Sequence, residues 1–475
     1  MSDHAPEPKL ATSADPATST PPPPAVQEPS KGPKVDSTEV GSVFVSNYPP
    51  FSFWNDDALT AYRDVLADPA SKMRDGRESP LGLYLHIPFC RKRCKFCYFR
   101  VYIDKNAGDI QRYLDALATE VERYAEQPAI AQRPLRFVYF GGGTPSYPAV
   151  KHMRALFDRV RGALPWVDVE EVTLECEPGT LTQSKVAAYR ELGITRLSLG
   201  VENWSEEILR ENGRAHEVKE IHRCLPWIRD QGFDQLNVDL IAGMVGETWE
   251  SWKTTVERTI DIDPDSVTIY QMELPFNTTY SQGILAGGES PVADWETKRA
   301  WNDHAIERFL DAGYEISSAY TVVKSKNHRK PGQGRFAYRD SLWHGADMLG
   351  TGIASFGHLG GVHAQNVTSW TEYLELVEAG ELPLGRAFPT SADERLTREL
   401  ILQMKLGRLD LGYFRGKFDV DPLERYGDLF ESLRERGMVD AIEPDHVELS
   451  RTGLLQVDSL LPAFYDARYQ NARYT

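Results

Sequence analysis

Two hydrophobic patterns alternate along the middle of the chain. Short and nearly continuous apolar runs, rich in β-branched and aromatic residues, occur at residues 81–87, 136–140, 171–176, 196–200, 235–241 and 266–272. Between them lie stretches with the apolar spacing of amphipathic helices, at residues 109–127, 150–164, 184–193, 217–232 and 249–262. Repeated strand–helix units predict a parallel sheet with both faces covered, either as an α/β barrel or as an open doubly wound sheet. In either architecture the loops that follow the strands carry the chemistry.

The two ends of the chain follow other patterns. Residues 1–40 are rich in Pro, Ala, Ser and Thr and offer little apolar surface, which predicts a disordered tail. Residues 41–80 form an N-terminal extension to the predicted α/β domain at 81–320. Residues 366–475 read as helices, a short β-pair and a helix, which indicates a small α+β domain of winged-helix type. The intervening segment 321–365, rich in glycine and histidine, is expected to lie over the mouth of the barrel or sheet.

Composition excludes several classes of function. The formal net charge of −17 argues against a nucleic-acid-binding protein and against attraction to an anionic membrane surface. No apolar run approaches the roughly 18–20 residues that span a bilayer, and the N-terminal region lacks the apolar core of a signal peptide. We therefore expect a cytoplasmic protein in a reducing compartment, where clustered cysteines are metal ligands more often than disulfides.

Three of the five cysteines, Cys90, Cys94 and Cys97, lie within eight residues directly after the first apolar run. A zinc site normally has four ligands in paired C-x2-C units, and Cys176 and Cys224 stand alone and supply no second pair. A second interpretation is that the three cysteines are buried as small hydrophobic residues. The four basic residues around them argue against burial and would instead promote thiolates: Arg91, Lys92, Arg93 and Lys95. The third interpretation is a [4Fe–4S] cluster on three thiolates, which leaves one iron open to a ligand.

A run of glycines ends the second predicted strand, at Gly141, Gly142 and Gly143, with Thr144 directly after it. One interpretation is an ordinary tight turn between strand and helix. The other is a stretch of backbone without side chains that a ligand can approach closely enough to bond its N–H and C=O groups.

Carboxylates stand at the ends of the following strands: Glu175 after the third, Glu202 after the fourth and Asp239 inside the fifth. Arg214 follows Glu202 by twelve residues. A carboxylate in an apolar strand is unfavourable unless it is paired or binds a ligand. These residues could form structural salt bridges with Arg214. Alternatively, the acids could bind hydroxyl groups of a ligand while Arg214 binds its carboxylate.

Together these motifs resemble the radical S-adenosylmethionine (SAM) proteins that include oxygen-independent coproporphyrinogen III dehydrogenase (oxidase) and haem chaperones. The resemblance rests on YLHIPFC, C-x3-C-x2-C, YFGGGTPS, EPGTL, RLSLGVE, GRAH and NVDLIAGMVGET, and runs from about residue 45 to the end. It implies a partial parallel (β/α)6 barrel with a small winged-helix-like C-terminal domain. It also implies a [4Fe–4S] cluster on Cys90, Cys94 and Cys97, whose open iron is chelated by SAM. The residues that it places on SAM are Tyr84, Phe96, Gly142, Gly143, Thr144, Glu175, Glu202, Arg214, Asp239 and Ile241.

The chain departs from this group at three places. The dehydrogenase carries a fourth cysteine two residues after the third, where this chain has Phe99. A glutamine normally stands at the position of Glu202. The haem chaperones carry a His-Asn pair after the barrel, and the corresponding stretch here, 338–345, keeps Trp343 and has no such pair. These departures leave the reaction open within the group.

The resemblance implies an enzyme that cleaves SAM to a 5′-deoxyadenosyl radical, which then abstracts hydrogen from a tetrapyrrole or another large substrate. A reduced flavodoxin or ferredoxin would donate the electron. Alternatives are a methylating, cyclopropane-forming or haem-degrading relative, a non-catalytic haem chaperone and a structural zinc protein. The catalytic residue is unknown. Of the histidines at 344, 358 and 363, which are otherwise ordinary polar loop residues, His344 is the candidate for binding substrate or donating a proton.

Overall fold

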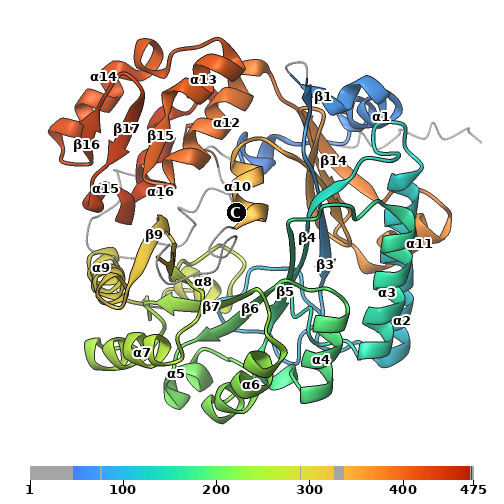
Figure 1. Ribbon diagram of the computed structural model, residues 1–475, viewed down its shortest axis with the longest axis horizontal. Helices are drawn as coiled ribbons and strands as arrows, with labels where there is room; N and C mark the ends of the chain where they lie inside the picture. The colour runs from blue at the N-terminus through green and yellow to red at the C-terminus, as the bar shows by residue number, and fades with distance from the viewer. Residues whose placement is uncertain (1–46, 75–76, 289, 326–335, 471, 473–475) are drawn as a thin grey trace, which may run out of the picture. The chain divides into compact units, whose positions relative to one another are not determined.

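The six predicted strands form the parallel centre of one large sheet (Figure 1). The computed structural model describes residues 47–74, 77–288, 290–325, 336–470 and 472, so the predicted tail at 1–40 lies outside the described residues. The six strands are β3 (Leu81–Ile87), β4 (Leu135–Gly142), β5 (Glu171–Cys176), β6 (Arg196–Glu202), β7 (Gln235–Ala242) and β8 (Ser266–Gln271). They pair in sequence order with parallel register, so each needs a crossover connection to the next strand.

Helices between the strands pack around the outside of this parallel region (Figure 1). They are α2 (Ala107–Ala125), α3 (Val150–Ala163), α4 (Gln183–Glu191), α5 (Glu206–Glu211), α6 (Val218–Gln231), α7 (Trp249–Asp261), α8 (Thr279–Leu285) and α9 (Trp295–Asp311). Local sequence sets their ends. Asn106 caps α2 by accepting from the backbone N–H of Asp109, and Gly232 ends α6 in the left-handed conformation.

The sheet extends beyond the predicted strands on both sides. Within the described residues it has twelve strands, in the order β14-β13-β12-β11-β3-β4-β5-β6-β7-β8-β10-β9. The added strands are β9 (Tyr314–Ser318), β10 (Thr321–Lys324), β11 (Asp347–Thr351), β12 (Phe356–Leu359), β13 (Val362–Asn366) and β14 (Leu384–Pro389). Strand β11 runs parallel to β3, whereas β12, β13 and β14 follow as an antiparallel meander. The fold is therefore α/β, with a partial parallel barrel extended by antiparallel strands.

The segment 321–365 does not lie over the barrel mouth as a whole, because most of it belongs to the sheet. The helix in this segment, α10 (Ala337–Trp343), begins against the amino-terminal end of β5. There Glu171, the first residue of that strand, accepts the backbone N–H of Ala337 at 3.1 Å. The ring of Tyr338 packs at a tilt against that of Tyr139 of β4, with 4.3 Å between the ring centroids. The helix thus packs at the end of the strands opposite to the loops that carry the predicted site.

The three histidines of this segment have different surroundings. His344 is exposed at the end of α10, and its backbone carbonyl accepts bonds from the C-terminal domain. His358 and His363 are buried strand residues rather than loop residues, and their Nδ1 atoms lie 3.2 Å apart. His363 also stacks on Trp54 at 4.9 Å. None of the three lies among the residues at the carboxyl ends of β3–β8, so the structure gives no support for His344 as a substrate ligand.

The C-terminal domain has its own core. A three-stranded sheet in the order β15-β17-β16 packs with helices into a second hydrophobic cluster that includes Leu400, Phe414, Phe430 and Leu461. Its strands are β15 (Arg408–Asp410), β16 (Val439–Ile442) and β17 (His446–Leu449), and its helices are α12 (Ala392–Met404), α13 (Leu411–Phe418), α14 (Pro422–Glu435), α15 (Arg451–Leu455) and α16 (Val457–Leu460). This is the predicted winged-helix-like arrangement. It starts near residue 391 rather than 366, because β14 still pairs with the large sheet.

The remaining elements lie at the antiparallel edge and in short turns. Helix α1 (Leu59–Ala67) contacts β14, α11 (Trp370–Glu378) contacts α2, and β1 (Met73–Arg74) pairs with β2 (Arg77–Glu78). Short 3₁₀ helices occur at Phe51–Phe53, Pro69–Lys72, Pro178–Thr180, Leu461–Phe464 and Ala467–Tyr469. Over the described part of the chain, no helix is both long enough and apolar enough to cross a membrane.

Glu120 joins α2 to the antiparallel strands in the core. Its buried carboxyl accepts bonds from the N–H of Gly352 at 2.8 Å, from Asn366 at 2.7 Å and from the hydroxyl of Tyr373 at 2.7 Å. Burial raises the pKa of this carboxyl from 4.5 to about 7, against the lowering effect of these bonds.

This raised pKa predicts a pH dependence of stability. The fold favours the protonated carboxyl, so its contribution is fully present below about pH 4.5 and is lost as pH rises through about 7. We expect the unfolding free energy of the wild type to fall between pH 5 and pH 8 by up to about 3 kcal/mol more than that of Glu120→Gln. Urea unfolding of both proteins at the two pH values measures this difference. Equal pH dependence in the two proteins would show that the carboxyl does not titrate in this range.

Candidate functional site

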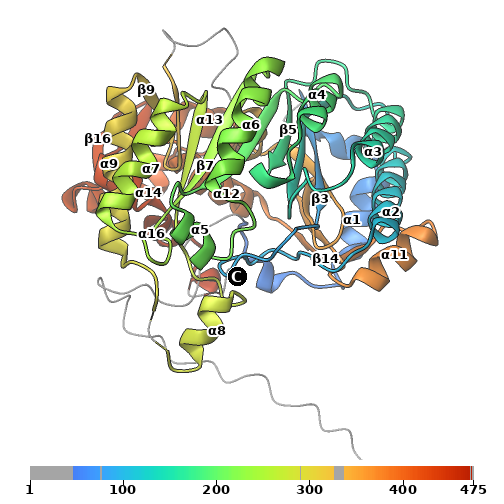
Figure 2. The same cartoon turned by 90° about the horizontal axis from the view of Figure 1, so that it is seen from below.

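The three clustered cysteines lie on a loop that leaves the carboxyl end of β3. Two backbone hydrogen bonds close the base of this loop. The N–H of Cys90 donates to the carbonyl of Tyr102 at 3.1 Å, and the N–H of Tyr102 donates to the carbonyl of Pro88 at 2.7 Å. Its far side is held by α5 and α8 (Figure 2), because the N–H of Lys95 donates to the carbonyl of Asn212 and the N–H of Thr279 donates to that of Lys95. The loop therefore has a defined conformation, with all three cysteines partly buried.

An ion-pair network ties this loop to the ends of β5 and β6. Arg91 donates to Glu177 from Nε at 3.1 Å and from Nη2 at 2.8 Å, and its Nη2 also reaches the carbonyl of Ala215 at 3.0 Å. His216 lies 3.3 Å from the same carboxylate. Burial opposes ionisation of Glu177, but His216 and Arg91 outweigh it and lower the pKa from 4.5 to about 2. Glu177 therefore stays ionised and holds the cysteine loop beside the loop that carries Arg214.

Loss of this carboxylate should loosen the cysteine loop. We expect Glu177→Gln to lower the unfolding free energy by about 1–3 kcal/mol, because Arg91 loses one charged acceptor of a bidentate pair. The variant should also retain less iron after anaerobic reconstitution, measured per mole of protein. Glu217→Gln is the matched control, since Glu217 forms an ion pair with exposed Lys219 and takes no part in the Arg91–Glu177 pair, and it should behave as the wild type. Normal stability and iron content in Glu177→Gln would remove the anchoring role.

The basic residues of the loop act differently from the sequence-based expectation. Arg91 and Lys95 pair with the carboxylates of Glu177 and Glu211, so they do not activate the thiols. Burial raises the pKa of Cys90 from 9.0 to about 12 and that of Cys97 to about 11. In the protein alone these side chains are therefore thiols, and bonding to a metal would be needed to deprotonate them.

The spacing of the three cysteines in space helps to distinguish a site for one zinc ion from a site for an iron–sulfur cluster. Across the described part of the chain, no three His, Cys, Asp or Glu side chains converge as ligands of one metal ion would. Ligands of a single zinc lie within about 4 Å of one another, because each Zn–S bond is about 2.3 Å long. Three thiolates bonded to separate irons of one cluster need not converge in this way. Cys90 and Cys94 also have polar neighbours, as Thr144 Oγ1 lies 3.4 Å from the first sulfur and Arg214 Nη1 lies 3.5 Å from the second.

A glycine cradle stands opposite the cysteine loop at the end of β4. Gly142 has φ +111°, and a Cβ atom there would lie 2.5 Å from the buried imidazole of His86. A Cβ at Gly143 would lie 2.9 Å from the carbonyl oxygen of Ile87. His86 in turn lies 3.2 Å from the hydroxyl of Tyr84. Only glycine fits at these positions because they pack against the end of β3, so the glycine run forms the tight turn between strand and helix. Close approach of a ligand to this backbone stays a prediction.

Glu175 closes one side of the cradle. It accepts from the hydroxyl of Tyr139 at 2.8 Å and from the N–H of Gly142 at 3.1 Å. Burial raises the pKa of this carboxyl to about 7, and the negative charge of nearby Asp239 contributes in the same direction. The carboxyl is therefore near the midpoint of its titration at neutral pH.

Arg214 and two further carboxyls complete the site at the ends of β6 and β7. The guanidinium of Arg214 lies 3.3 Å from Glu202 and donates to the carbonyl of Gly200 at 2.9 Å, while its buried Nε has no hydrogen-bond partner among the described residues. Glu202 has φ +63°, which is rare for a side-chain-bearing residue, and burial raises its pKa to about 7 against the effect of Arg214. Asp239 accepts from Ser198 at 2.7 Å, and burial raises its pKa also.

An apolar patch adjoins these polar residues. Ile241 of β7 packs with Met244, Met272 and Leu274, and Phe96 of the cysteine loop packs against the same cluster. Two side chains that the resemblance placed on SAM, Phe96 and Ile241, therefore belong to one apolar cluster, although they are distant in sequence. An apolar patch beside carboxyls suits a ligand with an aromatic ring and hydroxyl groups.

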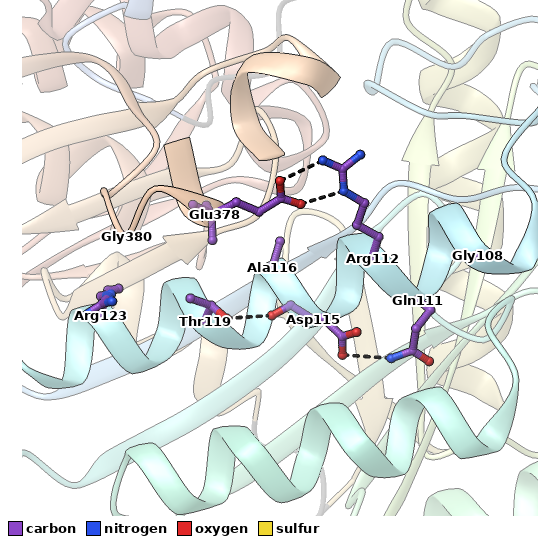
Figure 3. Close-up of a pocket in the computed structure, with 10 residues that line it drawn as sticks. Gly108, Gln111, Arg112, Asp115, Ala116, Thr119, Arg123, Glu378 and Gly380 are labelled. Atoms are coloured by element: carbon purple, nitrogen blue, oxygen red, sulfur yellow. Dashed lines mark hydrogen bonds and ion pairs between the residues drawn. The ribbon is translucent and has the colours of Figure 1, made fainter. Parts of the chain in front are cut away.

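The structure thus gathers the residues predicted for the cluster and SAM at the carboxyl ends of β3–β7. They fit the implied cofactors, since the Cys94 thiol lies 3.5 Å from the buried guanidinium of Arg214, whose Nε has no partner within the described protein. The sequence analysis did not single out Glu177, His216 or His86 as functional. The available signal for Glu177 was its acid side chain directly before a Pro-Gly turn at a strand end. A separate pocket between α2 and α11, bordered by the Arg112–Glu378 ion pair, lies away from these residues (Figure 3).

Comparison with known proteins agrees with the geometry. Residues 84–259 match the family model of the radical SAM superfamily. An oxygen-independent coproporphyrinogen III oxidase of Synechocystis is 27% identical over 387 residues, which cover 78% of this chain and 79% of that protein. The heme chaperone HemW of Bacillus subtilis is 24% identical, covering 80% of this chain and 98% of that protein. The structure of coproporphyrinogen III oxidase (HemN) from Escherichia coli superposes with a TM-score of 0.75 at 23% identity, covering 89% of this chain and 96% of that one. This last likeness establishes the fold.

Proposed function

The chain carries a radical SAM domain and resembles the group of oxygen-independent coproporphyrinogen III oxidases and haem chaperones, and we propose that it is an enzyme acting on a tetrapyrrole. Proteins of this superfamily use a [4Fe–4S] cluster and SAM. The observation that carries the proposal is the meeting of Cys90, Cys94 and Cys97 with the glycine cradle and Arg214 at the carboxyl ends of the parallel strands.

The protein's own residues would hold and orient these cofactors. The three cysteines would bind the cluster, which, when bound, supplies the electron that cleaves SAM to an adenosyl radical. Gly142 and Gly143 would present backbone groups to the amino end of SAM, and Arg214 would bind its carboxylate through the unpartnered Nε. Phe96 and Ile241 would pack on the adenine, as their shared apolar cluster suggests.

The carboxyls suit the other parts of the same ligand. Glu175, Glu202 and Asp239 lie together and have raised pKa values, so they can accept from ribose hydroxyls without adding three full negative charges. The burial of these three carboxyls would also limit the access of water to the part of SAM where the adenosyl radical forms. Exclusion of water would protect this radical from side reactions. We propose a reduced flavodoxin or ferredoxin as the electron donor.

Coproporphyrinogen III is the first substrate to test. The protein should be reconstituted with iron and sulfide without oxygen, reduced, and incubated with SAM and coproporphyrinogen III. Loss of carboxyl groups in the product, detected by mass spectrometry, would identify the oxidative decarboxylation of propionates to vinyl groups. Addition of a methyl group or opening of the ring would instead identify a related radical reaction. An unchanged mass for every tetrapyrrole in a small panel would contradict the proposed substrate class.

A haem chaperone is the second candidate, and the residue that favours it is Phe99. The oxidase group carries a fourth cysteine at that position, which this chain lacks. A chaperone would bind haem in a one-to-one ratio and pass it to an apoprotein without consuming SAM. The absence of the His-Asn pair of the chaperones between 338 and 345 argues in the other direction. Measurement of haem binding and SAM consumption in the same sample separates the two functions.

A further inference from the structure

Three aromatic side chains near the cysteine loop are unusually open to solvent. Tyr98 and Phe99 directly follow Cys97, and their rings stack at 4.4 Å with an angle of 27° between the planes. They are 44% and 43% exposed, and Tyr270 at the end of β8 is also 44% exposed. Large aromatic side chains cost free energy when they are left in water. Neighbouring exposed rings beside a candidate cofactor site therefore indicate a surface that a ligand covers.

Both tyrosines lie close enough to carboxyl groups of the barrel for those charges to act on their hydroxyls. Protein atoms around the Tyr98 hydroxyl raise its pKa, and the carboxylates of Glu273 and Glu175 add to this effect. The same shielding raises the pKa of Tyr270, with contributions from Asp239 and Glu175. Glu175 belongs to β5 and Asp239 to β7, whereas Glu273 follows β8.

The position of the rings is fixed by the loop that carries the cysteines. The carbonyl of Tyr98 accepts a bond from Nδ2 of Asn277 at 2.8 Å, so the aromatic pair is held against the segment that follows β8. Because Phe99 is two residues from Cys97, a ligand on its ring would lie beside the predicted cluster. The residue that replaces the fourth cysteine thus supplies an apolar ring at the same place.

We propose that Tyr98, Phe99 and Tyr270 form the substrate-binding wall of this protein, and that the wall stacks against the pyrrole rings of a tetrapyrrole that carries carboxylate side chains. The inference rests on the proposed function and adds the residues that select the substrate. Stacking on aromatic rings suits pyrroles. A tyrosine hydroxyl is neutral at pH 7, so it can donate to a substrate carboxylate without bringing a second negative charge near it.

The test is a binding titration with coproporphyrin III, the stable and fluorescent oxidised form of the macrocycle. It uses the full chain with its cluster reconstituted, without oxygen, and compares Phe99→Ala and Tyr270→Ala with the wild type. Phe53→Ala is the matched control, because Phe53 is 40% exposed in the N-terminal extension and packs edge-on against Tyr469. The visible absorbance of the cluster is recorded for each protein, so that cluster loss is distinguished from loss of the wall.

Each wall variant should bind coproporphyrin III about 10-fold more weakly, as removal of a stacking ring does elsewhere, while Phe53→Ala binds as the wild type. Equal affinity of all four proteins, or no binding by the wild type, would overturn the wall. Weakened binding in the wall variants of a protein that never converts a tetrapyrrole would support the wall and refute the proposed enzyme. If the wild type converts a tetrapyrrole and the variants bind coproporphyrin III with unchanged affinity, the proposed enzyme is supported and the wall is refuted.

Discussion

Replacement of Cys94 by serine is expected to abolish reductive SAM cleavage and to prevent assembly of the cluster. Serine cannot supply the thiolate that iron prefers, and Cys94 is also the sulfur that Arg214 approaches at 3.5 Å. Changes to groups that only support a metal ligand already cost 10–100-fold, so loss of the ligand itself should lower 5′-deoxyadenosine formation by more than about 100-fold. Iron content and the visible absorbance of the reconstituted protein should fall with it.

The control for this variant is Cys224→Ser. Cys224 is buried in α6 and its sulfur lies 3.4 Å from the carbonyl of Ile221, a contact that a serine hydroxyl can reproduce. It should retain the cluster and the cleavage rate. A Cys94→Ser protein with normal iron and absorbance would show that the three cysteines do not hold the cluster.

Substitution of Gly142 by alanine should cause the second large loss. The backbone there has φ +111°, which an L side chain rarely adopts, and the new Cβ would lie 2.5 Å from the ring of His86. We expect a destabilisation of about 1–3 kcal/mol from the backbone alone and loss of SAM affinity by more than about 10-fold, since the cradle can no longer keep its shape. Equilibrium binding of SAM to the reconstituted protein measures the second effect.

A glycine in open space provides the comparison. A Cβ at Gly162 of α3 would meet no atom within 4 Å, and alanine is the better helix former. Gly162→Ala should therefore raise stability by about 0.5–1 kcal/mol and leave SAM binding unchanged. Equal SAM affinity in Gly142→Ala and Gly162→Ala would exclude the cradle as a cofactor contact.

The parallel strands were predictable because each is apolar along nearly its whole length. Strand β3, for example, is buried at six of its seven positions, and its sequence boundaries coincide with the structural ones. Strand β11 was missed, since Asp347–Thr351 contains one glycine and two polar residues and is completed only by pairing with β3. The position of α10 could not be predicted either, because it depends on Glu171, which is far away in sequence.

The site was predictable where chemistry requires a fixed spacing of residues. The cysteines and the glycine run are such patterns, and the structure brings them together with Arg214. The interactions that arrange them were not visible, because Arg91 and Glu177 are 86 residues apart. The basic residues around the cysteines were not decisive for the thiols, because Arg93 lowers the pKa of Cys97 but burial raises it by more. Sequence shows that the charges are near, but only the fold shows that carboxylates neutralise them and that burial raises the pKa of Cys90 and Cys97.

The central claim is that this protein uses a cluster on Cys90, Cys94 and Cys97 to cleave SAM on behalf of a tetrapyrrole substrate. The most direct measurement is the amount of 5′-deoxyadenosine formed by the reduced, reconstituted protein with and without coproporphyrinogen III, without oxygen. The account predicts formation that exceeds one equivalent per protein and rises when the substrate is present. No 5′-deoxyadenosine under either condition, in a protein that contains its full complement of iron and binds haem stoichiometrically, would contradict it.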